Sequence, residues 1–220
     1  MDIIYDHCIS LGADCGTARA IRQANYKDAT YPFDWAITKI KGLIQLIKND
    51  FQEYINFTYD KIGNDAFAIL NKTIYLPHEC TYQELSIKEK YDMQIDKHKR
   101  RAERFITLMN SGKNILLVRK CLNETKEDIL NLVEILKEKY SSCKFHLLFF
   151  SSQKDNDTLN SDIITHKFSD NYFFVKYNKC RDTYFHSDES SYYKQFVRYI
   201  KRFNMSQTFD QIPLGNDRIE

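Results

Sequence analysis

The sequence predicts a layered α/β domain with a mostly parallel central sheet, and three observations carry this prediction. Two apolar runs of strand length, 114–118 and 145–150, flank an amphipathic helical segment, which is the pattern of a βαβ crossover and therefore of a parallel strand pair. A third apolar run, 5–11, leads through a glycine turn into another helical segment. With 6 glycines and 3 prolines among 220 residues, few positions interrupt regular structure.

The N-terminal half is expected to alternate strand and helix. A strand over 5–11 precedes a helix over 15–24. Thr38 is expected to be the N-cap of a second helix that lays one face on the core. The apolar residues of that helix recur at helical spacing: Ile40, Leu43, Ile44, Ile47 and Phe51. Alternating apolar residues from 66 to 76 indicate a small antiparallel hairpin, inserted before the crossover.

The C-terminal half supplies the crossover and its continuation. A long helix over 86–110 is expected to stop at Gly112. It is followed by strand 114–118, helix 124–140, strand 145–150, strand 172–177 and helix 190–203. This alternation is typical of a Rossmann-like layer order. No linker-like segment divides the chain, so we expect one α/β domain over 1–205 and a polar C-terminal tail over 206–220.

Composition excludes several classes of partner. The 32 basic and 30 acidic residues leave a net charge of +2, so no overall field attracts nucleic acid or an anionic membrane. The first six residues carry acid where a secretory signal needs Lys or Arg, and the apolar runs are too short to cross a bilayer, so we expect a cytoplasmic protein. Six dispersed cysteines without metal-binding spacing are expected to be free thiols, and no metal or cofactor is expected.

Cys15 is the leading candidate for chemistry. It follows a strand and a glycine turn and falls on the first turn of a helix, where unpaired N–H groups and the helix dipole favour an anion. We therefore expect the pKa of Cys15 to lie below the free value of about 8.5. The backbone N–H groups from Gly12 through Asp14 to Cys15 are expected to stabilise an oxyanion. The alternative is a small residue packed at a tight turn.

Cationic side chains suggest a second kind of site. Arg119 follows the strand 114–118, and if that strand and 5–11 are parallel neighbours, Arg119 faces the same crevice as Cys15. Its alternative role is a salt bridge to Asp14 or Glu124. Five arginines are expected to converge on one rim that suits phosphate or carboxylate: Arg19, Arg22, Arg101, Arg104 and Arg119. The alternative for the basic run 97–104 is a solvated helix face, on which we expect His98 to lie.

Several motifs together resemble a known family. The motifs are Ser10-Leu11-Gly12 with Cys15, Pro32-Phe33-Asp34-Trp35, Asn49-Asp50-Phe51, His78-Glu79, Arg100-Arg101-x-x-Arg104-Phe105 and Leu117-Val118-Arg119. This order resembles the "putative papain-like cysteine peptidase" family, a domain family of bacteria and large DNA viruses, over about the first 150 residues. Papain-like folds place the cysteine helix against an antiparallel sheet, whereas the periodicity here predicts parallel strands. We base the fold prediction on the periodicity.

The resemblance also implies roles for individual residues. Cys15 would be the nucleophile, His78 the base, and Asp34 a candidate to orient the imidazole. Asp34 has an alternative role, in which its carboxylate caps a turn or a helix while Phe33 and Trp35 fill the core.

Three functional hypotheses follow. The first is a cysteine-dependent hydrolase, a papain-like peptidase or acyltransferase, acting on a peptide or small-molecule substrate. The second is a transferase or esterase that binds a phosphorylated or sugar substrate at the arginine-lined rim. The third is a non-catalytic interaction protein.

Overall fold

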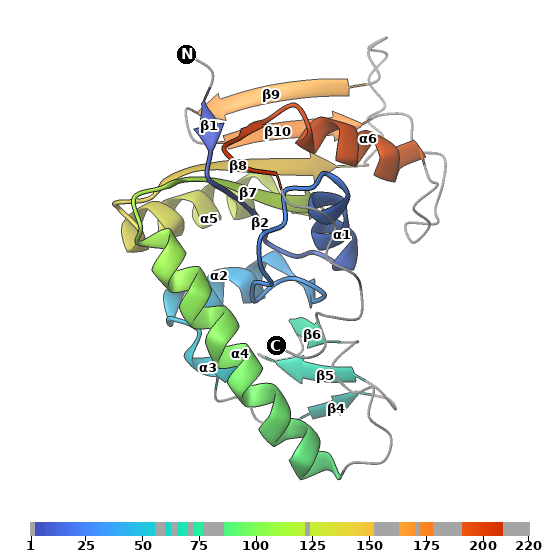
Figure 1. The fold of residues 1–220 in the computed structure, drawn as a ribbon, viewed down its shortest axis with the longest axis vertical. Coiled ribbons are helices and arrows are strands. Elements are labelled where there is room, and N and C mark those ends of the chain that lie inside the picture. Colours follow the sequence, from blue (N-terminus) through green and yellow to red (C-terminus); the bar gives the residue numbers. More distant parts are fainter. Residues whose placement is uncertain are drawn as a thin grey trace.

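The computed structural model describes residues 3–55, 60–62, 66–69, 73–76, 86–121, 124–151, 163–169, 172–177 and 191–208. Figure 1 labels the helices and strands on the ribbon. The helices are α1 (Cys15–Gln23), α2 (Ile40–Lys48), α3 (Gln52–Ile55), α4 (Ile87–Met109), α5 (Lys126–Lys139) and α6 (Ser191–Ile200). The strands are β1 (Ile4–Tyr5), β2 (His7–Ser10), β3 (Ile37–Thr38), β4 (Asp60–Ile62), β5 (Ala66–Ile69), β6 (Ile74–Leu76), β7 (Asn114–Cys121), β8 (Lys144–Ser151), β9 (Ile163–Ser169), β10 (Tyr172–Tyr177) and β11 (Asn204–Met205).

The central sheet has five strands in the order β2-β7-β8-β10-β9. Strands β2, β7, β8 and β10 run parallel, and β9 runs antiparallel to β10 at the far edge. This arrangement confirms the predicted mostly parallel α/β sheet and the crossover from β7 through α5 to β8. The predicted hairpin is also present, but it belongs to a larger antiparallel sheet in the order β3-β6-β5-β4. Strand β9 is an addition that the sequence patterns did not indicate.

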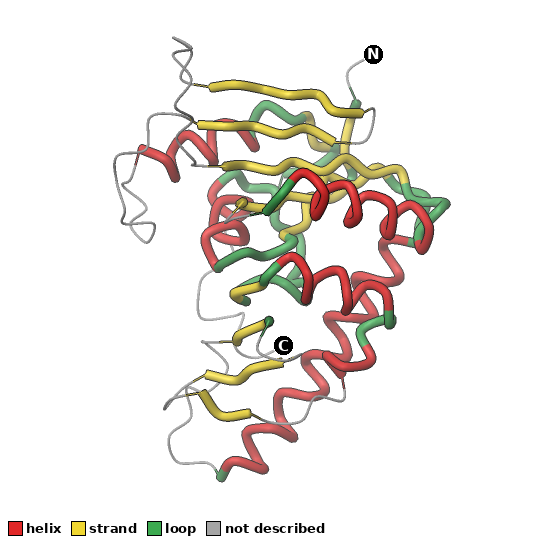
Figure 2. The backbone as a smooth tube through the Cα atoms, turned by 180° about the vertical axis from the view of Figure 1, so that it is seen from behind, coloured by secondary structure: helices red, strands yellow, loops and turns green. Residues whose placement is uncertain are grey.

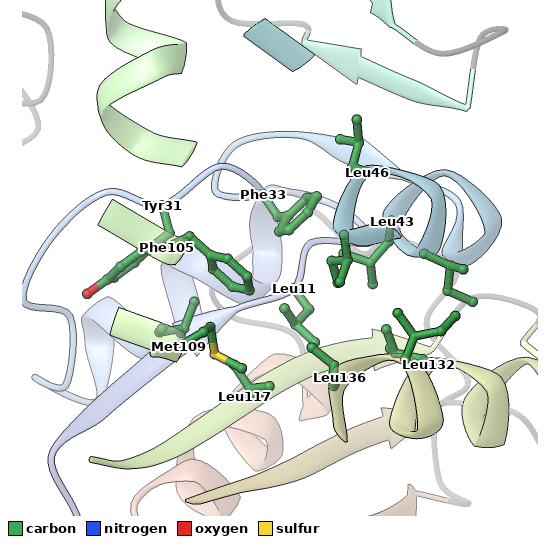
Figure 3. Close-up of a cluster of buried hydrophobic side chains, with 14 of the residues drawn as sticks. Leu11, Tyr31, Phe33, Leu43, Leu46, Phe105, Met109, Leu117, Leu132 and Leu136 are labelled. Carbon is green, nitrogen blue, oxygen red and sulfur yellow. The ribbon is translucent and has the colours of Figure 1, made fainter. Parts of the chain in front are cut away.

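Helices cover both faces of the central sheet. Alternate residues of a strand point to opposite faces, and β7 divides in this way. Leu117 packs into a core shared with α2, α3, α4 and α5, whereas Leu116 packs into a second core shared with α1 and α6. Figure 3 shows the first core, where Phe33 and Phe105 lie above Leu117. The domain is therefore a three-layer sandwich, with α1 and α4 on opposite faces.

Helix α4 links the two larger sheets. Its C-terminal end lies near the central sheet and its N-terminal end lies beside β4 and β5 (Figures 1 and 2). Ser86 and Glu89 form a capping box at its start, and Gly112 follows its end with a φ of 70°. The predicted helix over 86–110 is thereby confirmed.

The start of α2 corrects one prediction. Lys39, with no side-chain cap, occupies the N-cap position, and Thr38 belongs to β3 instead. The reason is tertiary, because the Thr38 hydroxyl contacts the turn after β2 and the Arg119 guanidinium. The helix also ends earlier than its apolar pattern suggests, since Asp50 and Phe51 have φ values of 51° and 60°.

His98 corrects a second prediction. It is completely buried, not solvated, and its Nδ1 lies 2.8 Å from the Tyr54 hydroxyl. Helical spacing accounts for this, because His98 precedes Ala102 and Phe105 by four and seven residues on the buried stripe.

The first and last described strands lie side by side. Strand β1 pairs in parallel with β11, and the Ser206 N–H donates to the Tyr5 carbonyl oxygen at 2.8 Å. The expected tail over 206–220 is described only to residue 208. Among the described helices, none combines the length and the apolar character needed to span a membrane.

Candidate functional site

The candidate site lies at the carboxyl end of β2, where a tight turn leads into α1. Gly12 and Ala13 are both in the left-handed region, with φ values of 74° and 84°. A Cβ atom on Gly12 would lie 2.3 Å from Thr38 Oγ1 and 3.3 Å from the Phe33 carbonyl oxygen. Glycine is therefore required for both its backbone conformation and its lack of a side chain. The two main motifs of the sequence, around residues 10–15 and 32–35, meet at this glycine.

Cys15 is the first residue of α1 and is half-buried. Burial raises its pKa, and the neighbouring Asp14 carboxylate raises it further. Arg19, the backbone N–H of Cys15 and Lys120 act in the opposite direction without reversing the shift. The predicted lowering of the Cys15 pKa is therefore wrong, because desolvation and the N-cap carboxylate outweigh the helix N-terminus. The raised pKa favours the thiol form of Cys15 at neutral pH.

Asp14 has structural partners on both carboxylate oxygens. Oδ1 accepts the Gly16 N–H at 2.9 Å, which caps α1, and Oδ2 forms an ion pair with the buried Lys120 ammonium. Lys120 is on β7, so this pair joins the start of α1 to the neighbouring strand. Asp14 therefore holds Cys15 in place and adds negative charge beside it.

The turn offers fewer oxyanion donors than the sequence suggests. The Gly12 N–H donates to Ser10 Oγ at 3.1 Å, and the Ala13 N–H donates to Thr38 Oγ1 at 2.9 Å. Both donors are thus used within the protein. The N–H groups of Asp14 and Cys15 are the remaining candidates in this turn.

Arg119 is fully buried and forms a salt bridge with Glu124. Its Nε and Nη2 both donate to Glu124 Oε1, at 3.0 and 2.7 Å. Nη1 donates to the Leu11 carbonyl and to Thr38 Oγ1, and Nη2 also donates to the Thr38 carbonyl. All five guanidinium N–H groups therefore have protein acceptors, which favours the structural alternative over contact with a substrate.

The five arginines do not gather into one rim. Arg19 is on α1, near Cys15, whereas Arg101 and Arg104 are on α4, which packs against the opposite face of the sheet. Arg101 is buried, and Arg104 is exposed and donates to the Thr30 carbonyl at 2.7 Å. The structure thus separates Arg101 and Arg104 on α4 from Arg19 and Arg22 on α1.

Asp34 is buried and engaged by its own loop. Its Oδ2 forms an ion pair with Lys27 and accepts the Tyr31 N–H at 2.7 Å. This is the turn-capping role named as the alternative, and Phe33 is fully buried beside it while Trp35 is half-buried. His78 lies outside the described residues.

Thr38 is the site residue that sequence reasoning misassigned. The sequence pattern predicts a helix cap, but the Thr38 hydroxyl contacts Ala13 and Arg119 from 25 and 81 residues away along the chain. Its place three residues after Trp35, in a segment carrying a recognisable motif, was the available signal.

Comparison with known proteins places these residues in context. A family model described as "Putative papain-like cysteine peptidase (DUF1796)" matches residues 6–155. This range includes the turn at Cys15 and both Asp34 and Arg119, but not β9, β10 or α6. A curated relative, "Uncharacterized protein R408" of Acanthamoeba polyphaga mimivirus, is 23% identical over 167 residues, which cover 63% of this chain and 75% of the viral protein. No solved structure matches the chain.

Proposed function

The chain belongs to the family of putative papain-like cysteine peptidases, and on this premise we propose that it is a cysteine-dependent hydrolase with Cys15 as its nucleophile. The placement of Cys15 carries the proposal: it is half-buried, begins α1, and stands at the carboxyl end of a parallel strand. Of the other cysteines whose side chains the structure describes, Cys8 is buried in the core and Cys143 packs against Met109.

The raised pKa of Cys15 determines what the mechanism needs. A resting thiol becomes nucleophilic only if a base takes its proton during attack. We assign this role to His78, following the family motif. For Asp34 we favour the turn-capping role, because its Oδ2 is already shared by Lys27 and Tyr31.

The proposed reaction is acyl transfer in two stages. Cys15 Sγ bonds to the substrate carbonyl carbon while the thiol proton passes to His78, and the C=O electron pair moves onto oxygen. The N–H groups of Asp14 and Cys15 stabilise that oxyanion. As the tetrahedral intermediate collapses, the leaving group departs with the proton from His78. Water then attacks the thioester, giving a carboxylic acid and the free thiol.

The substrate class follows from this chemistry. It is a peptide or another compound with an acyl group, and the reaction requires the reduced sulfur that a reducing cytoplasm maintains. We favour the hydrolase over the transferase-or-esterase alternative, since Arg119 has protein acceptors for all its N–H groups and α4 lies across the sheet from α1.

A test uses p-nitrophenyl acetate and a mixture of peptides as probes, with mass mapping of the enzyme after a rapid acid quench. We expect an acetyl group on Cys15 and loss of hydrolysis in Cys15→Ala. The His78→Ala variant should be slower by about 10²- to 10⁴-fold. Cys143→Ala is the matched control and should retain the wild-type rate. Hydrolysis by Cys15→Ala at the wild-type rate would refute the assignment.

A further inference from the structure

Thr38 contacts both sides of the strained turn that presents Cys15. Its Oγ1 accepts the Ala13 N–H at 2.9 Å, and its own N–H donates to the Ala13 carbonyl at 3.2 Å. Ala13 has a φ of 84°, which a residue with a side chain adopts at a cost. The two hydrogen bonds to Thr38 compensate for this conformation.

Arg119 holds Thr38 in the orientation that these bonds require. It donates to Thr38 Oγ1 at 3.0 Å and to the Thr38 carbonyl at 2.8 Å, while Glu124 balances the buried charge. Thr38 is completely buried, so water does not compete for the hydrogen bonds of its hydroxyl. Glu124, Arg119, Thr38 and Ala13 therefore form one connected polar chain that ends two residues before Cys15.

Thr38 is also fixed from the side of the antiparallel sheet. It pairs with Ile74 of β6, and the Lys39 N–H donates to the Thr73 carbonyl at 2.9 Å. Contacts with both the central sheet and the antiparallel sheet thus fix the position of the turn. No other described residue has hydrogen bonds to both the N–H and the carbonyl of Ala13.

We propose that Thr38 is a positioning residue for the nucleophile, acting through the peptide groups of Ala13. By accepting the Ala13 N–H, its hydroxyl holds the turn so that the N–H groups of Asp14 and Cys15 are the ones left for an oxyanion. The catalytic meaning of this role rests on the proposed function. The positioning itself does not, because it sets the environment of the Cys15 sulfur in the resting protein.

The test compares Thr38→Val, which removes the hydroxyl, with Thr38→Ser, which keeps it. Iodoacetamide alkylation of each cysteine is followed from pH 6 to 10 by mass mapping. In Thr38→Val, we expect the labelling midpoint of Cys15 to move down towards the free-thiol value of about 8.5, as the turn loosens and burial is lost. A midpoint that is lower by about one pH unit corresponds to a tenfold larger thiolate fraction at neutral pH.

Internal references separate positioning from general loosening. Cys143 and Cys8 should keep their wild-type rates in Thr38→Val, and Thr38→Ser should restore the Cys15 profile. Tyr26→Phe is the matched control, because it removes a hydroxyl that lies beyond the C-terminal end of α1 and donates to the Phe203 carbonyl at 3.1 Å, without contacting the turn before Cys15. Its Cys15 profile should be that of the wild type.

Three results would overturn the inference: an unchanged Cys15 profile in Thr38→Val, a Thr38→Ser variant that behaves like Thr38→Val, or equal acceleration of all three thiols. A Cys15 profile that shifts as expected, in a protein whose wild type hydrolyses no acyl probe, would refute the proposed function and leave the positioning role standing.

Discussion

Replacing Glu124 by alanine removes the carboxylate that neutralises a fully buried arginine. The side chains of Arg119 and Glu124 are 0% and 3% exposed, so the pair lies out of contact with bulk water. Two guanidinium N–H groups, on Nε and Nη2, lose their shared acceptor. The guanidinium would remain charged in a protein interior with only neutral oxygens around it.

The expected loss of folding stability in Glu124→Ala is large because the Arg119 charge stays buried. Hydrogen bonds to charged groups contribute about 1.5–3 kcal/mol each, so two of them give about 3–6 kcal/mol. Removing one partner of a buried ion pair typically costs about 3–5 kcal/mol of folding stability, which agrees with this range. We therefore expect Glu124→Ala to lower the free energy of unfolding by about 3–5 kcal/mol, a large part of the roughly 5–15 kcal/mol of a typical domain.

Urea unfolding followed by fluorescence measures this change, since Trp35 is the single tryptophan of the chain. With a denaturant dependence of about 2.5 kcal/mol/M, the midpoint should fall by about 1–2 M. Glu124→Gln, which keeps one acceptor oxygen, should lie between the wild type and Glu124→Ala.

A more exposed ion pair supplies the matched control. Lys139 Nζ lies 2.5 Å from Asp50 Oδ1, with side chains 22% and 57% exposed. Lys139→Met should cost no more than about 1 kcal/mol. A Glu124→Ala midpoint equal to that of Lys139→Met would show that the buried pair contributes no more than an exposed one, and the reasoning about the Arg119 environment would fail.

Two further predictions concern the same part of the fold. Gly12→Ala should lower the free energy of unfolding by at least about 2 kcal/mol in the same urea assay. The reason is that the added Cβ would lie 2.3 Å from Thr38 Oγ1, on a residue with a φ of 74°. A loss below about 0.5 kcal/mol would contradict this geometry. Burial raises the pKa of Asp28, but hydrogen bonds from His7 and Tyr31 and the charge of His7 lower it more, so the net shift is downward. The contribution of Asp28 to stability is therefore present at pH values above its unfolded pKa of about 3.9, and it is lost as the pH falls through its folded pKa. The difference in unfolding free energy between wild type and Asp28→Asn should shrink from pH 6 to pH 3. A difference that is constant or grows would contradict the downward pKa shift.

Local periodicity predicts those helices and strands whose buried residues recur at a regular spacing along the chain. The crossover from β7 through α5 to β8 was recognisable because its apolar residues recur at the spacing of strands and helices. The pattern fails at the end of α2, where Phe51 fits the helical spacing but belongs to the next turn. A buried residue shows that a position faces the core, and it does not show that the helix continues to it.

The candidate site was predictable in its location but not in its electrostatics. A cysteine after a strand and a glycine turn is visible in the sequence, and Cys15 indeed begins α1. The direction of its pKa shift depends on burial and on the pairing of Asp14 with Lys120, 106 residues away. Arg119 presents the same difficulty, because its role is set by Thr38, which is 81 residues away along the chain.

The pairing of β1 with β11 has a consequence for biosynthesis. A ribosome releases the N-terminal strand first, yet the partner of that strand and helix α6, which covers one face of the sheet, are made nearly 200 residues later. Until then, Leu116, Val118 and Phe150 lack the aromatic side chains of α6 above them. Leu116 precedes the first residue of α6, Ser191, by 75 residues, so a nascent chain carries this apolar face uncovered through about a third of its synthesis, and a holdase chaperone would find its binding surface there.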